Sequence, residues 1–169
     1  FVDAKPKRFN NLNLKYTFDN FIVGSNNEFA KTASESVSNN PGEQNFNPLI
    51  IYGGVGLGKT HLMHAIGNNA LNHNSDLNIV NITSEQFTLD FVNSLRKNKT
   101  IEFAQNYRSA DILLIDDIQF FRGKEQTQEQ FFHTFNVLHQ GGKQIVLTAD
   151  KFPGEMKGLQ TRLLSRFQS

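Results

Sequence analysis

Residues 53–60, GGVGLGKT, carry the residue types and spacing needed to hold a polyphosphate. They fit the pattern G-x-x-x-x-G-K-[ST], in which glycines let successive backbone N–H groups point at one anion. Lys59 would reach the β- and γ-phosphates of a nucleotide, and the Thr60 hydroxyl would bind Mg²⁺. The alternative is a glycine-rich turn that never meets phosphate. The residues predicted to line a nucleotide are Gly53, Gly54, Val55, Gly56, Leu57, Gly58, Lys59, Thr60 and the following His61.

Two acidic residues follow a second apolar run, ILLIDD at residues 112–117. Parallel α/β sheets bind ligands at the carboxyl ends of their strands, where Asp116 would lie. Asp116 could hold a water molecule on Mg²⁺, and Asp117 could orient and polarise a water that attacks phosphate. Either aspartate could instead cap the turn that follows. Two adjacent acids beside a metal favour hydrolysis over binding alone.

A further strand end, LTAD at residues 147–150, offers a polar group that could sense the terminal phosphate. Asp150 or Thr148 could do this, or either could cap the KFPGEM turn. The five histidines are not accompanied by other residues spaced to bind a metal with them. His61 and His64 stand one turn apart on the helix expected after the phosphate loop, where packing or surface positions explain them better than metal binding.

The elements that must position these residues alternate between short apolar strands and helices. Strands are predicted at residues 49–52, 77–83, 111–116 and 143–149. Helices are predicted from a Ser25 or Asn26 cap to Val37, at 59–73, from 84 onward, at 100–108, after a Thr127 cap, and at 159–167. The helix residues predicted to form the apolar stripes are Phe29, Ala33, Phe87, Phe91, Leu95, Phe131, Phe135 and Leu138. The alternation predicts an α/β fold with a parallel sheet and right-handed crossovers.

The bulk composition fits one domain with a core, because the chain has 169 residues. A net charge of +1 predicts no general attraction to nucleic acid or membrane, and the lack of cysteine excludes disulfides and Cys-ligated zinc. No apolar run is long enough to span a bilayer, and the N-terminus has no signal-peptide core. We expect a cytoplasmic protein or a piece of one, with residues 1–15 as a linker or arm and 16–169 as the nucleotide-binding core.

Five stretches of the sequence resemble the AAA+ core of the bacterial chromosomal replication initiators, the DnaA family. The resemblance covers residues 12–167 and is carried by YTFDNFIVGSNNEFA, NPLIIYGGVGLGKTHLMHAIGN, LLIDDIQFFRGKEQTQEQFFHTFN, QIVLTAD and RLLSRF. It implies a P-loop NTPase of the AAA+ type that binds ATP or ADP with Mg²⁺. It also implies an ATP form that assembles as a right-handed helical oligomer on origin DNA, melts the duplex and helps to load the replicative helicase.

The resemblance also implies roles for single residues. Asp116 and Asp117 match the Walker B acids, and Asp150 matches the first sensor. Arg166, with Arg162 beside it, matches the arginine finger that reads the ATP of a neighbouring subunit. The residues that match the segment lining the adenine are Phe21, Val23 and Asn26. Residues 84–108 match a two-helix insertion that turns the ring of the wider superfamily into an open spiral.

Single-stranded DNA is a further partner that the resemblance implies. The positions matching the DNA-gripping residues of the family are Val92, Lys124 and Thr127. Gln126 stands where many relatives carry a basic residue, which weakens the electrostatic part of the grip, although Arg122 could compensate. Val92 could instead be a core residue, but it is offset from the predicted apolar stripe of its helix. The basic residues Arg96, Lys97 and Lys99 are best explained as a solvated helix end.

The family continues beyond the RFQS ending with a fifth strand, a helical lid with a second sensor arginine, and a helix-turn-helix module, so we expect an excised core. Three other functions stay open: a helicase loader of the DnaC type, a regulatory module that holds ADP without turnover, and a small-molecule kinase. The DNFIVG and FFHTFN matches favour the initiator over the loader. The complete phosphate loop and paired acids favour hydrolysis, and the arginine pair near residue 166 fits an oligomer better than a kinase.

Overall fold

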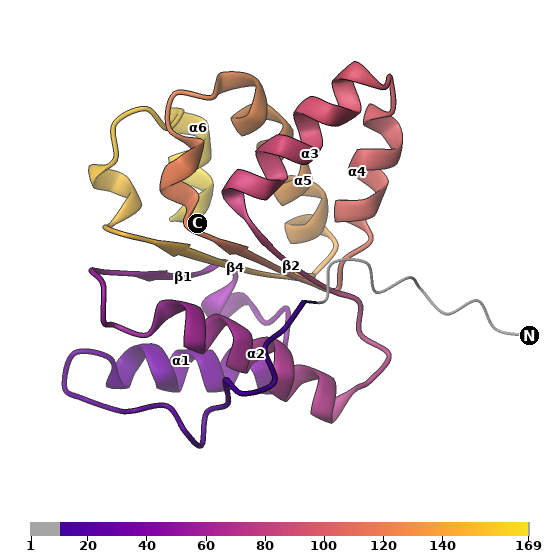
Figure 1. Cartoon of the computed structure of the whole chain (residues 1–169). Coiled ribbons are helices and arrows are strands. Elements are labelled where there is room, and N and C mark those ends of the chain that lie inside the picture. The colour runs from indigo at the N-terminus through magenta and orange to yellow at the C-terminus, as the bar shows by residue number, and fades with distance from the viewer. Residues whose placement is uncertain (1–10, 169) are drawn as a thin grey trace, which may run out of the picture.

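The computed structural model describes residues 11–168, which fold into a sheet with helices on both faces (Figure 1). The strands are β1 (Leu49–Tyr52), β2 (Ile79–Thr83), β3 (Ile112–Asp116) and β4 (Gln144–Ala149). The α-helices are α1 (Glu28–Asn39), α2 (Lys59–His73), α3 (Ser84–Arg96), α4 (Thr100–Arg108), α5 (Glu125–Gln140) and α6 (Thr161–Phe167). Short 3₁₀ helices lie at η1 (Gln44–Phe46), η2 (Ile118–Phe121) and η3 (Pro153–Glu155).

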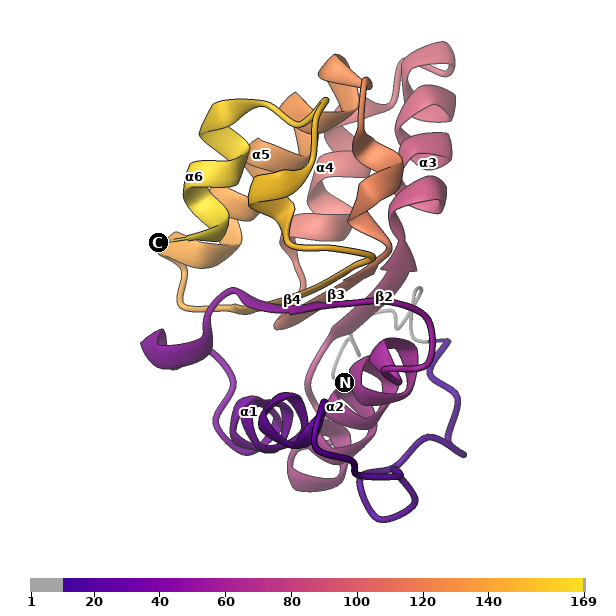
Figure 2. The same ribbon diagram turned by 90° about the vertical axis from the view of Figure 1, so that its left-hand side faces the viewer.

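The sheet has the strand order β1-β4-β3-β2, and every neighbouring pair is parallel. Helices α1 and α2 cover one face, and α3, α4, α5 and α6 cover the other (Figures 1 and 2). Strands β3 and β4 are buried along their whole length, because both of their faces are covered. The predicted α/β fold with a parallel sheet is confirmed. Since β4 lies between β1 and β3, the carboxyl ends of these three strands meet at one edge of the sheet.

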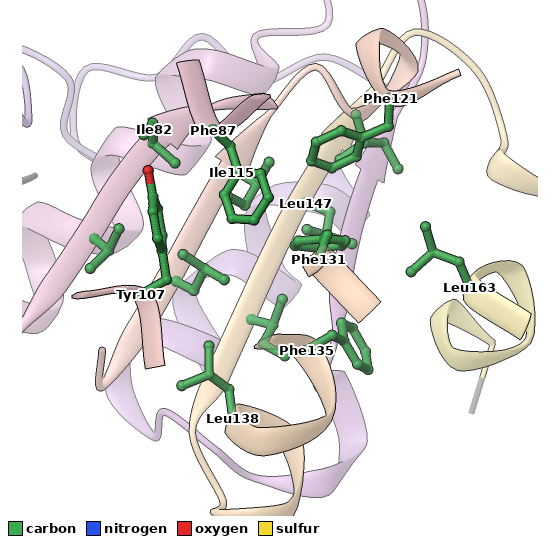
Figure 3. Close-up of a cluster of buried hydrophobic side chains, with 14 of the residues drawn as sticks. Ile82, Phe87, Tyr107, Ile115, Phe121, Phe131, Phe135, Leu138, Leu147 and Leu163 are labelled. Carbon is green, nitrogen blue, oxygen red and sulfur yellow. The ribbon is translucent and has the colours of Figure 1, made fainter. Parts of the chain in front are cut away.

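Phenylalanine fills much of the core between the sheet and helices α3 to α6 (Figure 3). The ring of Phe87 on α3 makes edge-on contacts with Phe103, Tyr107, Phe121 and Phe131. Aromatic pairs favour this edge-to-face geometry over a face-to-face stack. One side chain therefore joins α3 to α4, to η2 and to α5.

A fully buried glutamine connects three further parts of the same layer. Gln128 on α5 donates hydrogen bonds of 2.7 Å to the carbonyls of Phe121 and Gly158. Its Oε1 accepts the N–H of Gln160, the residue before α6, at 2.8 Å. Every polar atom of the amide is thus used at least once, as a buried side chain requires.

Residues 11–17 lie against α2. The Asn13 N–H donates to Nδ1 of His64 at 2.9 Å, and Asn68 Nδ2 donates to the carbonyls of Asn13 and Tyr16, each at 2.9 Å. Burial lowers the pKa of His64, which favours the neutral imidazole that can accept this hydrogen bond. Of the predicted arm, Leu12 and Asn13 therefore contact the helix, Leu14 is 79% exposed, and residues 1–10 lie outside the described part of the chain.

The start of α1 differs from the prediction. The helix begins at Glu28, because the turn before it continues through Asn27, whose side chain is used within that turn. Neither Ser25 nor Asn26 is its cap. Phe29 is 75% exposed rather than inward-facing, and its ring centre lies 6.3 Å from that of Phe46.

Two further expectations about helices are wrong. Thr127 does not cap α5, which begins two residues earlier at Glu125, so Thr127 lies buried in the first turn. On α3, Phe87 and Phe91 are buried but Leu95 is 47% exposed, because the last turn of the helix extends past the core. The other predicted boundaries lie within about two residues of the observed ones.

Candidate nucleotide-binding site

The glycine-rich loop joins the end of β1 to the start of α2. Gly56 and Gly58 have φ angles of +94° and +85°, a backbone region that L side chains rarely adopt. A Cβ atom on Gly58 would also lie 2.6 Å from Cε1 of Phe21. No side chain caps α2, so its first backbone N–H groups are left to bind a ligand in the loop. The loop thus has glycines in the left-handed conformation beside uncapped helix N–H groups, and phosphate binding there stays a prediction.

The Lys59 ammonium lies over the same loop. Its Nζ donates to the carbonyl of Gly53 at 2.6 Å and to that of Gly54 at 3.1 Å. An ammonium group has three donors, so these bonds leave one for an anion. The positive charge is therefore held where the loop would place a polyphosphate.

Asp116, at the end of β3, receives one hydroxyl on each carboxylate oxygen. Thr60 Oγ1 donates to its Oδ2 at 3.1 Å, and Thr148 Oγ1 donates to its Oδ1. Within residues 11–168 no three His, Asp or Glu side chains gather to bind a metal by themselves. Mg²⁺ commonly takes one or two protein oxygens and completes its shell with water and phosphate, so Thr60 and Asp116 fit this ion. The alternative in which Asp116 caps the next turn is not seen.

The backbone of Asp117 is held in an unusual conformation. Its φ and ψ of 61° and 58° lie in the left-handed region, which costs free energy in a non-glycine residue. Its N–H donates to Thr148 Oγ1 at 2.8 Å, and Ser84 Oγ donates to its carbonyl. Thr148 on β4 therefore bridges Asp116 and Asp117, and Ser84 at the start of α3 holds the backbone of Asp117.

The carboxylate of Asp117 does not cap η2 and instead accepts a hydrogen bond from Gln119 Nε2 at 3.3 Å. Burial, followed by the charge of Asp116, raises the pKa of Asp117 above its ordinary value. The hydrogen bond from Gln119 and the charge of Lys59 oppose this rise in pKa, and Asp150 adds to it. A raised pKa makes a carboxylate a better proton acceptor.

The two candidates for the phosphate sensor are in different environments. Thr148 is fully buried between the two acids, whereas Asp150 is exposed at the end of β4. The N–H of Asp150 donates to Gln119 Oε1 at 3.3 Å. Asp150 is thus linked to the region of Asp117, and its role as sensor stays a prediction.

The residues predicted to line the adenine lie on the loop before α1. Phe21 is buried against Gly58, whereas Val23 is 47% exposed and Asn26 is exposed. This loop therefore offers an apolar surface beside the P-loop.

Asn27, which the sequence did not single out, fastens this segment to the P-loop. Its Oδ1 accepts the N–H of Gly24 at 2.8 Å. Its Nδ2 donates to the carbonyl of Ile22 at 3.2 Å and to that of Leu57 at 3.4 Å. Asn27 is therefore the buried residue that contacts the P-loop, whereas a contact of Asn26 with the adenine stays a prediction.

The imidazole of His61 is directed away from the loop. Its Nε2 donates to the carbonyl of Thr17 at 2.7 Å, and its ring lies 4.8 Å from that of Tyr16 and 5.1 Å from that of Phe21. If His61 contacts the nucleotide, as predicted, it would do so through its backbone N–H at the start of α2.

A family model described as the bacterial DnaA ATPase domain matches residues 12–169. The chain belongs to this family. It is similar to domain III of the Thermotoga maritima replication initiation protein DnaA, at 51% identity and a TM-score of 0.89 over 93% of this chain and 65% of that one. Within the described residues, no helix combines the length and apolarity needed to cross a membrane.

Two further DnaA structures carry ligands. One, a replication initiator DnaA bound to AMPPCP and single-stranded DNA, is 43% identical with a TM-score of 0.89 over 94% of this chain and 49% of that one. The other, AMPPCP-bound DnaA from Aquifex aeolicus, is 43% identical with a TM-score of 0.88 over 93% and 49%. The DnaC helicase loader, at 17% identity and a TM-score of 0.67, shares the fold alone. The chain thus spans about half the length of these two DnaA structures.

The three residues that the DnaA resemblance predicted to contact single-stranded DNA line one surface hollow between α3 and the start of α5. Val92 is 39% exposed there, so the core interpretation of this residue is wrong. Thr127 is buried and contributes only to the wall, beside Gln126. Lys124 Nζ donates to the carbonyl of Phe120 at 2.8 Å. The hollow therefore holds one exposed cation next to an apolar side chain.

The arginine pair of this DnaA-family chain lies on α6, across the sheet from α2 (Figure 1). The guanidinium carbon of Arg162 lies 4.3 Å from the ring centre of Phe132 on α5, and that of Arg166 lies 5.7 Å from it. Arg162 also lies 3.9 Å from Glu129. Both arginines are exposed, on the face opposite the P-loop helix.

Proposed function

We propose that this chain is the ATP-binding and slowly hydrolysing core of a chromosomal replication initiator. The observation that carries the proposal is the meeting of Lys59, Thr60 and Asp116 at one edge of the sheet, with hydroxyl and carboxylate in contact. The 43% identity to a DnaA structure bound to AMPPCP and single-stranded DNA supports the same nucleotide and nucleic-acid partners.

In this proposal the polyphosphate of ATP or ADP follows the loop, with the N–H groups of α2 and the Lys59 ammonium around the β- and γ-phosphates. Mg²⁺, held by Thr60 and through water by Asp116, would neutralise part of the phosphate charge. Asp117 orients the attacking water, and its raised pKa suits it to accept a proton. Phe21, Val23 and Asn26 would line the adenine.

Assembly is the next part of the proposal. Arg166 would reach the γ-phosphate bound by the next subunit, because its own P-loop helix lies on the other face of the sheet. The γ-phosphate adds a charge that a guanidinium can pair with, so the oligomer would form with ATP and not with ADP. The resulting helical oligomer would melt origin DNA in the cytoplasm and help to engage the replicative helicase or its loader.

Single-stranded DNA would bind in the hollow between α3 and α5. Lys124 would contact phosphate, and Val92 would pack against sugars. Glu125 lies in the same hollow and Gln126 carries no charge, so the contact supplies little net electrostatic attraction. Binding should therefore be weak and indifferent to base sequence, with a salt dependence that comes from the single Lys124 contact.

Replacement of Lys59 tests the nucleotide site. Each charge-assisted contact to phosphate is worth about 1.5–3 kcal/mol, so Lys59→Ala should weaken ATP binding at least about tenfold. Titration calorimetry measures this, with Lys99→Ala as a control because Lys99 is exposed beside α4 and far along the chain from the loop. Unchanged ATP affinity in Lys59→Ala would remove the P-loop assignment.

A further inference from the structure

Three side chains hold Asp117, and they hold different parts of it. Thr148 binds its N–H and Ser84 binds its carbonyl, so these two fix the left-handed backbone. Gln119 binds its carboxylate, at 3.3 Å from Oδ1. Among the described contacts, the orientation of the Asp117 side chain therefore depends on Gln119.

The amide of Gln119 is used from both ends. Its Nε2 donates to Asp117, and its Oε1 accepts the N–H of Asp150 at 3.3 Å. The reverse orientation would set the amide oxygen against a carboxylate and the NH₂ group against an N–H donor. The chemistry of the two partners thus fixes which end of the amide faces Asp117.

We propose that Gln119 is a positioning residue for ATP hydrolysis: it aims the Asp117 carboxylate at the attacking water and ties it to the end of β4. This inference rests on the proposed function, in which Asp117 orients that water. Orienting water matters in the transition state and adds nothing to the binding of ATP. Gln119 should therefore act on kcat and leave ATP affinity unchanged.

Two substitutions separate the two ends of the amide. Gln119→Met keeps the length of the side chain and removes both hydrogen bonds. Gln119→Glu keeps an oxygen for the Asp150 N–H but removes the donor to Asp117 and adds a like charge. If Gln119 acts by aiming Asp117, kcat should fall about tenfold in Gln119→Met and at least as far in Gln119→Glu.

The experiment measures kcat, the Kd for ATP and the melting temperature in the full-length protein. Gln105→Met is the matched control, because Gln105 is exposed on α4. Orienting water adds nothing to ATP binding, so the Kd for ATP should stay at the unmodified value in Gln119→Met. Because Gln119 is only half-buried, the melting temperature should change little in either variant. Gln119→Glu adds a negative charge beside Asp117, so only Gln119→Met tests the effect on binding.

Three results would overturn the proposal. Normal kcat in both variants would show that Asp117 needs no such partner. Normal kcat in Gln119→Glu alone would assign the effect to the Asp150 N–H, and weakened ATP binding in Gln119→Met would make Gln119 a binding residue. Absence of hydrolysis in the unmodified protein would instead refute the proposed function, and this inference with it.

Discussion

Thr148→Val should destabilise the protein because one hydroxyl serves both acids. The Thr148 hydroxyl is fully buried, donates to Asp116 and accepts the N–H of Asp117 at 2.8 Å. Valine has nearly the same shape and can do neither. A hydrogen bond to a charged group contributes about 1.5–3 kcal/mol, and a buried N–H left without an acceptor costs about 1–3 kcal/mol.

The expected net loss in the free energy of unfolding is about 2–4 kcal/mol. It is smaller than the sum of the two values, because Asp117 is only partly buried and the added methyl group favours the core. For a domain of this size the melting temperature should fall by about 4–16 °C. Urea unfolding and calorimetry measure the two quantities.

The chain supplies a matched control in Thr134→Val. Thr134 on α5 is also fully buried, and its hydroxyl has no hydrogen-bond partner among residues 11–168. Removing an unpaired buried hydroxyl should change the free energy of unfolding by less than about 1 kcal/mol, or stabilise the protein. Equal losses in the two variants would refute the reasoning, because burial and shape alone would then explain both.

Two further predictions concern assembly and DNA. The Arg166→Ala variant should bind ATP with near-normal affinity and fail to form ATP-dependent oligomers, because helix α6 lies across the sheet from the P-loop helix of the same chain. Sedimentation with ATP and with ADP measures this, with Arg96→Ala as the control. Surviving ATP-specific assembly would remove Arg166 from the mechanism. Lys124→Ala should weaken single-strand binding by a similar factor for every sequence and flatten its salt dependence, as fluorescence anisotropy would show; a loss confined to some sequences would indicate base readout.

The phosphate loop and the acids could be predicted from sequence because their chemistry depends on neighbours in the chain. Lys59 follows the glycines directly, and Asp116 ends an apolar strand, so local pattern places each at a strand end. Parallel pairing then brings the two ends together, as the contact of Thr60 with Asp116 shows.

The residues that escaped prediction act through contacts distant in sequence. Asn27 donates to the carbonyl of Leu57, and Ser84 donates to that of Asp117. Neither contact produces a recognisable pattern in the neighbouring sequence. Leu95 and Phe29 continue an apolar periodicity past the end of the core, where the pattern no longer reports burial. Thr127 has the residue type of a helix cap but lies inside the first turn, because α5 begins two residues earlier.

The buried amide of Gln128 links the start of helix α6, which carries Arg162 and Arg166, to the end of η2. Helix α6 spans only Thr161–Phe167, too short to be held by its own backbone hydrogen bonds. Through Gln128, the residue before α6 is bonded to the same side chain that grips the end of η2. Helix α6 and the segment that directly follows Asp117 therefore cannot separate without breaking a hydrogen bond of this buried amide.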